Sequence, residues 1–212
     1  MKYRKHPKFG KEMRTYWDSF FEAYQMGHQP HRDYLMKLLK DRGVKSMLDV
    51  GCGTGPLYEL IDWDVKYKGV DYSWAMIKMA NDMFPDGEFE VQDARSLKES
   101  ACSWEAVVLL HCIDHVDNYC KAIAEAARVA DKYVLIVIWR SFIGEGTKLN
   151  PRNMYGKQEG DDPWEDTFLH EYSRKVLEDE FEHHGLKVEH IAEGEHICEP
   201  GTWNFIWLLK KT

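Results

Sequence analysis

Residues 48–55 decide the fold of this chain and read Leu48-Asp49-Val50-Gly51-Cys52-Gly53-Thr54-Gly55. An apolar, strand-like run leads into a turn that holds three glycines. Glycine suits such a turn because the backbone must bend sharply and approach a ligand without a Cβ in the way. A strand, a glycine-rich turn and a helix together bind nucleotide-like ligands at the carboxyl ends of an α/β sheet. Pro56 stands where a dinucleotide-binding motif would have its third glycine, which counts against NAD or FAD.

The rest of the chain alternates apolar, strand-like runs with helical stretches, the pattern of a parallel sheet covered on both faces. The expected strands are 46–50, 66–70, 88–92, 106–110, 133–139, 186–191 and 203–209. The expected helices are 31–42, 56–61, 74–81, 118–130 and 173–184, and a further helix is expected around 17–24. The last two strands are expected to form an antiparallel pair.

The composition is that of one globular domain. The chain has 212 residues, of which 30% are charged and 44% hydrophobic, an ordinary soluble mixture. Its wholly apolar runs, such as 106–110, are far shorter than the roughly eighteen residues of a membrane span. The N-terminus lacks the features of a secretory signal, so we expect a cytoplasmic protein. Five cysteines without a Cys-x-x-Cys pair argue against disulfides and a cysteine-rich zinc site.

The net charge of −8 would repel a phosphate backbone. We therefore expect no duplex nucleic acid partner, although the first 45 residues are locally basic.

Four segments resemble, in order and spacing, the motifs of class I S-adenosylmethionine methyltransferases. They are the glycine loop at 48–55, then 70–73 with Met76 and Ala80, then 91–94, and finally 104–111. The resemblance runs from about residue 45 to 139 and is looser in the final helix and strand pair. It implies an α/β, Rossmann-like fold with a doubly wound, seven-stranded, mostly parallel sheet and one reversed strand at the end.

The resemblance also implies S-adenosylmethionine as the cofactor. Asp71 would grip both ribose hydroxyls, because two acceptor oxygens on one carboxylate suit a vicinal diol. Asp93 would meet the adenine amino group, and Asp49 would act electrostatically beside the sulfonium and amino group. The full set of expected cofactor-binding residues is Asp49, Gly51, Cys52, Gly53, Asp71, Tyr72, Met76, Asp93, Ala94 and His111.

Candidate catalytic side chains follow the expected fourth strand. Methyl transfer is an in-line displacement, so the enzyme must mainly hold the nucleophile and the methyl group at near-attack distance. His115 could remove a proton from a hydroxyl or amine near neutral pH, with His111 as a second candidate. The alternative is that these histidines only line the wall of the pocket.

His111, Asp114 and His115 are also similar to a metal-binding cluster of the ubiquinone-pathway O-methyltransferases, although a histidine replaces the first acidic residue. A divalent metal is therefore an alternative to ordinary loop residues, and our main expectation is no metal. Arg140 could clamp a substrate carboxylate or form a surface salt bridge. Tyr16 and Trp17, on a helix that could equally face the core, are expected substrate contacts.

We expect four parts within one domain. They are an N-terminal helical cap at 1–44, a cofactor-binding core at 45–140, a substrate or lid loop at 141–170, and a closing helix and strand pair at 171–212. The stretch 142–166 is rich in glycine and proline and is too long for an idle connection, with a mobile surface loop as the alternative.

The expected function is methyl transfer to an oxygen or nitrogen atom of an acceptor. We favour a small-molecule acceptor, because an acidic chain of this length has little spare surface for recognising a macromolecule. A protein or tRNA methyltransferase and a catalytically silent cofactor-binding scaffold are the alternatives. A monomer or a homodimer is expected.

Overall fold

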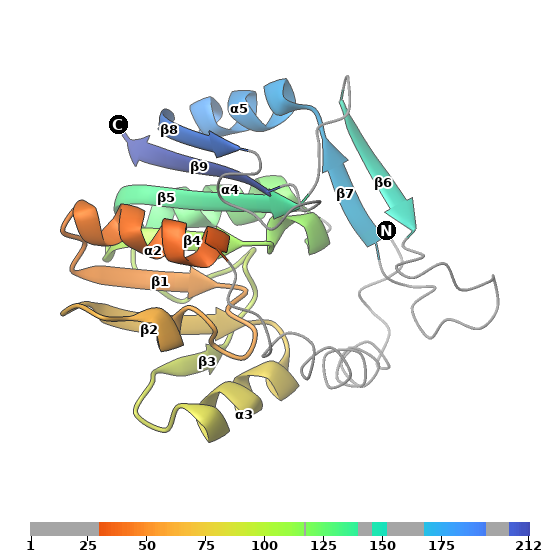
Figure 1. The fold of residues 1–212 in the computed structure, drawn as a ribbon. Coiled ribbons are helices and arrows are strands. Elements are labelled where there is room, and N and C mark those ends of the chain that lie inside the picture. Colours follow the sequence, from red (N-terminus) through yellow and green to blue (C-terminus); the bar gives the residue numbers. More distant parts are fainter. Residues whose placement is uncertain (1–29, 117, 140–145, 152–167, 194–203) are drawn as a thin grey trace.

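The computed structural model describes residues 30–116, 118–139, 146–151, 168–193 and 204–212. Seven strands form one sheet in the order β3-β2-β1-β4-β5-β9-β8 (Figure 1). Their bounds are β1 Ser46–Val50, β2 Lys66–Asp71, β3 Phe89–Val91, β4 Trp104–Leu110, β5 Ala130–Trp139, β8 Leu186–Glu193 and β9 Asn204–Lys211. Strand β9 runs antiparallel to both of its neighbours, and the strands from β3 to β5 pair in parallel. The predicted seven-stranded, mostly parallel sheet with one reversed strand is confirmed.

Helices cover both faces of this sheet. On one face lie α2 (Pro30–Asp41), the single-turn helix η2 (Tyr58–Leu60) and α3 (Trp74–Met83), packed on a core that contains Met47 and Val108. On the other face lie α4 (Tyr119–Val129) and α5 (Arg174–His183), packed on a core that contains Leu48 and Val107. Figure 1 shows α2 in front of the sheet and α4 behind it. Alternate residues of β1 and β4 therefore serve opposite cores, as a strand buried on both faces requires.

Polar side chains begin three of the helices. Ser73 Oγ accepts a hydrogen bond from Met76 N at 3.3 Å, and Ser173 Oγ accepts one from Val176 N at 3.3 Å. Asn118 does the same for α4 through its side-chain oxygen. Each contact satisfies a backbone N–H that has no partner within its own helix. Ser173 thus caps the helix that the sequence analysis expects over 173–184.

The carboxyl ends of the parallel strands lie at one edge of the sheet, on the right in Figure 1. Successive strands run outward from β1 to β3, and the chain then returns to place β4 on the other side of β1. This reversal is the topological switch point at which α/β sheets bind ligands. The site must therefore be sought around the ends of β1, β2 and β4.

Two segments differ from the sequence prediction. The helix expected over 56–61 is only the one turn of η2, since Ile61 is already extended, and so short a helix has little hydrogen bonding to offset the cost of its nucleation. The segment expected as a loop at 141–170 contains β6 (Thr147–Pro151), which pairs antiparallel with β7 (Phe168–Tyr172). Pro151 is the last residue of β6, a position where a missing N–H is tolerated.

No helix within the described ranges is long and apolar enough to cross a bilayer.

Candidate functional site

The glycine loop turns back over the end of β2. Gly51, Gly53 and Gly55 all have positive φ, at 78°, 55° and 85°, a conformation that glycine adopts without a steric penalty. The N–H groups of Gly51 and Cys52 both donate to the carbonyl oxygen of Val70, at 2.7 and 3.1 Å. A Cβ built on Gly53 would meet no atom within 4 Å. There is consequently open space beside this turn, where a ligand can approach the backbone.

Asp71 ties this loop to the start of α3. Its Oδ2 accepts a hydrogen bond from Gly53 N at 3.0 Å, and its Oδ1 accepts one from Ser73 N at 2.7 Å. Burial raises the pKa of Asp71, and these two backbone N–H groups lower it. Each carboxylate oxygen retains a second acceptor position. The half-buried side chain can therefore accept bonds from two neighbouring hydroxyls while it holds the loop.

Asp49 is a deeply buried acidic group at this edge, with 1% of its surface exposed. Its Oδ2 accepts a hydrogen bond from the hydroxyl of Tyr67 at 2.8 Å, whereas its Oδ1 has no hydrogen-bond partner in the described part of the chain. Burial raises the pKa of Asp49 to about 7, with the Tyr67 hydrogen bond and Arg32 acting in the opposite direction. A buried oxygen without a donor is costly, and it fits a cationic ligand such as an ammonium group.

The other residues expected at the cofactor differ in their surroundings. Cys52 and Met76 are buried at 3% and 4% exposure, and burial raises the pKa of the Cys52 thiol. Tyr72, next to Asp71, is 55% exposed. Ala94 is partly buried against the core behind the sheet. The ring of Tyr72 is therefore accessible from the same edge as Asp71.

Asp93 is already engaged by its neighbour Arg95. The guanidinium Nε lies 2.9 and 3.1 Å from the two carboxylate oxygens, and Arg95 N donates to Oδ1 at 2.9 Å. The predicted contact of Asp93 with an adenine amino group would have to share these oxygens with Arg95.

The end of β4 carries a second group of polar side chains. His111 has φ of 51°, although it is not glycine, and such backbone conformations gather at functional sites. Its backbone N–H donates to Val137 O on β5 at 2.9 Å. His115 closes the one-turn helix η3 (Ile113–His115) that follows. The sheet thus fixes the backbone at the position from which the His111 side chain extends.

His111 meets a histidine that the sequence analysis missed. His31, in the first turn of α2, lies with its Nε2 3.4 Å from Nε2 of His111, and the two rings are nearly perpendicular. Burial lowers the pKa of His31 to about 4 and that of His111 well below its usual value; the charge of Arg32 acts in the same direction on both. Both imidazoles are therefore neutral near pH 7, so each ring has a nitrogen lone pair.

Arg32 was also missed, and it is only 5% exposed. Its charge acts on Asp49 as well as on the two histidines. A signal was available, because His31 and Arg32 precede Leu35, Met36 and Leu39 on the buried side of α2. Polar residues that continue the apolar stripe of a helix are expected to face a site or a partner.

Strand β7 holds η3 from the side. The hydroxyl of Tyr172 donates to Ile113 O at 3.0 Å, and its ring packs edge-on against Tyr119 at 4.8 Å. Asp114 is buried at 1% exposure beside this contact. Within the described ranges, no group of three or more His, Cys, Asp or Glu side chains is placed to hold a metal ion. The alternative metal cluster of His111, Asp114 and His115 is thus not assembled.

Three expected substrate contacts cannot be placed. Tyr16, Trp17 and Arg140 lie outside the described residues.

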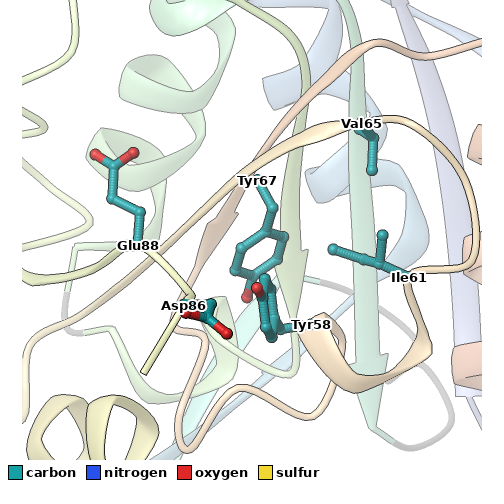
Figure 2. A pocket seen from close by; sticks show the side chains of 6 residues that line it. All are labelled: Tyr58, Ile61, Val65, Tyr67, Asp86 and Glu88. Atoms are coloured by element: carbon teal, nitrogen blue, oxygen red, sulfur yellow. The ribbon is translucent and has the colours of Figure 1, made fainter. Parts of the chain in front are cut away.

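An open pocket of about 460 Å³ lies beside Tyr67 (Figure 2). It is lined by Tyr58, Ile61, Val65, Tyr67, Asp86 and Glu88. These residues come from η2, from β2 and from the segments that lead into β2 and β3. Tyr67 therefore contributes its ring to the pocket and its hydroxyl to Asp49.

Comparison with known proteins identifies the family. A family model described as a methyltransferase domain matches residues 17–191, more than half of the chain, so the chain belongs to this methyltransferase family. The predicted family is thereby confirmed.

Two curated relatives and one solved structure illustrate the likeness. Ajmaline N-methyltransferase from Rauvolfia serpentina is 31% identical over 106 residues, which cover 46% of this chain and 36% of the relative. A ubiquinone/menaquinone biosynthesis C-methyltransferase from Campylobacter jejuni is 30% identical over 115 residues, 50% of this chain and 46% of the relative. The chain thus spans less than half the length of the curated relatives it matches.

The solved structure is 1,6-didemethyltoxoflavin-N1-methyltransferase from Burkholderia thailandensis, with its acceptor and S-adenosylhomocysteine bound. It gives a TM-score of 0.69 at 13% identity and covers 97% of this chain and 89% of that protein. At that identity the likeness concerns the fold, which agrees with the predicted Rossmann-like class.

Proposed function

We propose that this chain transfers a methyl group from S-adenosylmethionine to an atom of a small molecule. The observation that carries the proposal is the joint placement of the glycine loop, Asp49 and Asp71 at the switch point of the sheet. The open space beside Gly53 fits the turn around the cofactor, and the two acceptor oxygens of Asp71 fit its ribose diol. The Asp49 oxygen that lacks a partner among the described residues fits its ammonium group.

Arg32 completes the recognition of the cofactor's amino acid part. It is buried near Asp49 and His111, so a carboxylate that enters there would gain a charged partner in surroundings of low dielectric. Asp49 and Arg32 would then bind the two ends of a zwitterion. The negative charge of Asp49 would pair with the ammonium group of the cofactor, and the positive charge of Arg32 would pair with its carboxylate.

His31 and His111 would serve the acceptor. The bound cofactor supplies an electrophilic methyl group at its sulfonium. The protein must align the nucleophile and accept its proton where it has one. The neutral imidazoles of His31 and His111 can accept that proton, and His115 lies next in the chain on η3. Burial keeps both imidazoles unprotonated at pH 7 and also makes them weaker proton acceptors, because the best general base has a pKa near the working pH.

The acceptor is proposed to be a small molecule, through oxygen or nitrogen. The curated relatives act, by their names, at nitrogen and at carbon, so carbon acceptors belong in the test. The net charge of −8 favours a protein without a duplex nucleic acid partner. We further propose that it works in the cytoplasm as a monomer or a homodimer.

The decisive experiment is an unbiased acceptor screen. Purified protein and methyl-labelled S-adenosylmethionine are incubated with amines, phenols, carboxylates and carbon acids, and in parallel with tRNA and protein fractions. The expected result is label in one small-molecule class and none in the Asp71→Ala variant. Label confined to tRNA or protein would contradict the acceptor class. Binding of S-adenosylhomocysteine without any transfer would support the silent scaffold.

A further inference from the structure

The side chain of Tyr67 lines the pocket shown in Figure 2 and donates a hydrogen bond to Asp49 through its hydroxyl. In the parallel pairing of β1 with β2, Tyr67 stands opposite Met47, and Gly69 stands opposite Asp49. The hydroxyl of Tyr67 donates to Asp49 Oδ2 on the neighbouring strand at 2.8 Å. Both residues are buried, at 6% and 1% exposure.

This hydrogen bond divides the two oxygens of Asp49 between the protein and the ligand. Oδ2 is held by Tyr67, and Oδ1 has no partner among the described residues. A carboxylate that is held at one oxygen cannot rotate freely, so the direction of the other oxygen is fixed before a ligand arrives. We propose that Tyr67 is a positioning residue that holds Asp49 ready for the cofactor's ammonium group, an inference that rests on the proposed function.

The position of the Tyr67 hydroxyl is set by aromatic packing outside the cofactor site. Figure 2 shows the rings of Tyr58 and Tyr67 side by side, with their centroids 5.2 Å apart. Phe89 packs edge-on against Tyr67 at 5.8 Å. Such offset and edge-on contacts restrain a ring by packing. The hydroxyl therefore keeps its place when the cofactor leaves.

The hydroxyl also favours the ionised form of Asp49. Burial raises the pKa of Asp49 to about 7, the Tyr67 hydrogen bond lowers it, nearby Asp71 raises it and Arg32 on α2 lowers it. The buried Cys52 thiol, on the glycine loop, is also close enough for its pKa to be raised by Asp49. Only ionised Asp49 can form an ion pair with an ammonium group. Loss of the hydroxyl raises the pKa of Asp49 further, so the ionised form would be lost at a higher pH.

Calorimetric titration with S-adenosylhomocysteine tests this proposal between pH 6 and 8.5. Tyr67→Phe should bind about tenfold more weakly at pH 6 to 7, as expected for the loss of one hydrogen bond to a charged group. The deficit should narrow toward pH 8.5, where Asp49 is ionised in both proteins. The matched control is Tyr58→Phe, which removes a hydroxyl from the same aromatic cluster and should leave the profile unchanged.

A double-mutant cycle sharpens the test. In an Asp49→Asn background, Tyr67→Phe should change the affinity by less than about twofold, because the carboxylate it serves is gone. A deficit that is equal at every pH, no deficit at all, or a Tyr67→Phe protein that is unfolded at 25 °C would each overturn the proposal. If the wild type failed to bind S-adenosylhomocysteine at any pH, the proposed function itself would fail, which is a distinct outcome.

Discussion

The two halves of the site are built from opposite chemistry and at different ranges in the sequence. At the ends of β1 and β2, Asp71 is held by backbone N–H groups 2 and 18 residues away. At the end of β4, His111 meets His31 from a position 80 residues away. The first half consists of carboxylates next to the glycine loop, with Asp71 held by nearby backbone groups. The second half consists of imidazoles that are brought together by the packing of α2 on the sheet.

Burial shifts the pKa values of the two halves in opposite directions. It raises the pKa of Asp49 and Asp71 and lowers the pKa of His31 and His111. In each case burial favours the neutral form, because low dielectric penalises a lone charge. We expect a cationic ligand to favour the ionised form of Asp49, whereas the neutral histidines keep lone pairs that can accept a proton.

The largest expected effect is in the first half, at Gly53. Gly53→Val should abolish measurable binding of S-adenosylhomocysteine, since a β-branched side chain would enter the open space beside the loop and strain a backbone of positive φ. Calorimetry and thermal melting measure both effects. Gly43→Val is the matched control, because Gly43 has a similar φ of 66° with equally open surroundings at the end of α2. Retained affinity in a folded Gly53→Val protein would place the cofactor elsewhere.

Substitutions in the second half of the site should lower the turnover number. We expect His111→Asn to lower kcat by about 100-fold, the usual contribution of a general base. Asparagine is chosen because it tolerates the positive φ of this position. Binding of S-adenosylhomocysteine should change far less. His190→Asn, on β8 beside Tyr34, is the control. An unchanged kcat with the acceptor found in the screen would remove His111 from the mechanism.

The Asp71→Ala substitution tests the first half of the site. It should weaken S-adenosylhomocysteine binding by roughly 10- to 150-fold, the range expected when hydrogen bonds to a charged group are lost. Part of the loss comes from the loop, because Gly53 N and Ser73 N lose their acceptor. Asp93→Ala is the comparison, and its effect should be smaller, since that carboxylate is shared with Arg95. Calorimetry gives both values, and equal affinities for Asp71→Ala and the wild type would show that the second motif is wrongly assigned.

The smallest expected effect tests how η3 is held. Tyr172→Phe keeps the ring against Tyr119 but removes the hydrogen bond to Ile113 O. The expected loss of stability is about 1 kcal/mol, which is typical of one such bond. Urea unfolding measures that loss, and kcat should fall by only a few-fold. A drop in kcat as large as that of His111→Asn would mean that η3 matters more than the histidine pair.

The sequence by itself determined the sheet and the first half of the site. The strands at 46–50 and 66–70 and the glycine turn are specified by short-range patterns, and the structure reproduces them. Asp71 and Asp93 were expected from the resemblance to the methyltransferase family, and the pairing of Asp93 with Arg95 was not foreseen. Patterns of hydrophobicity and glycine reveal backbone geometry because they act between near neighbours.

Only the tertiary structure determined the contact of His31 with His111 and the hydrogen bond from Tyr67 to Asp49. His31 and Arg32 join the site because α2 packs across the sheet, and Tyr67 on β2 contacts Asp49 on the neighbouring strand β1. Strand β7, paired with β6, holds η3 through Tyr172. The contacts of Tyr172 with η3 and of His31 with His111 join residues 59 and 80 positions apart. No local pattern specifies them, because their partners are selected by the packing of whole elements.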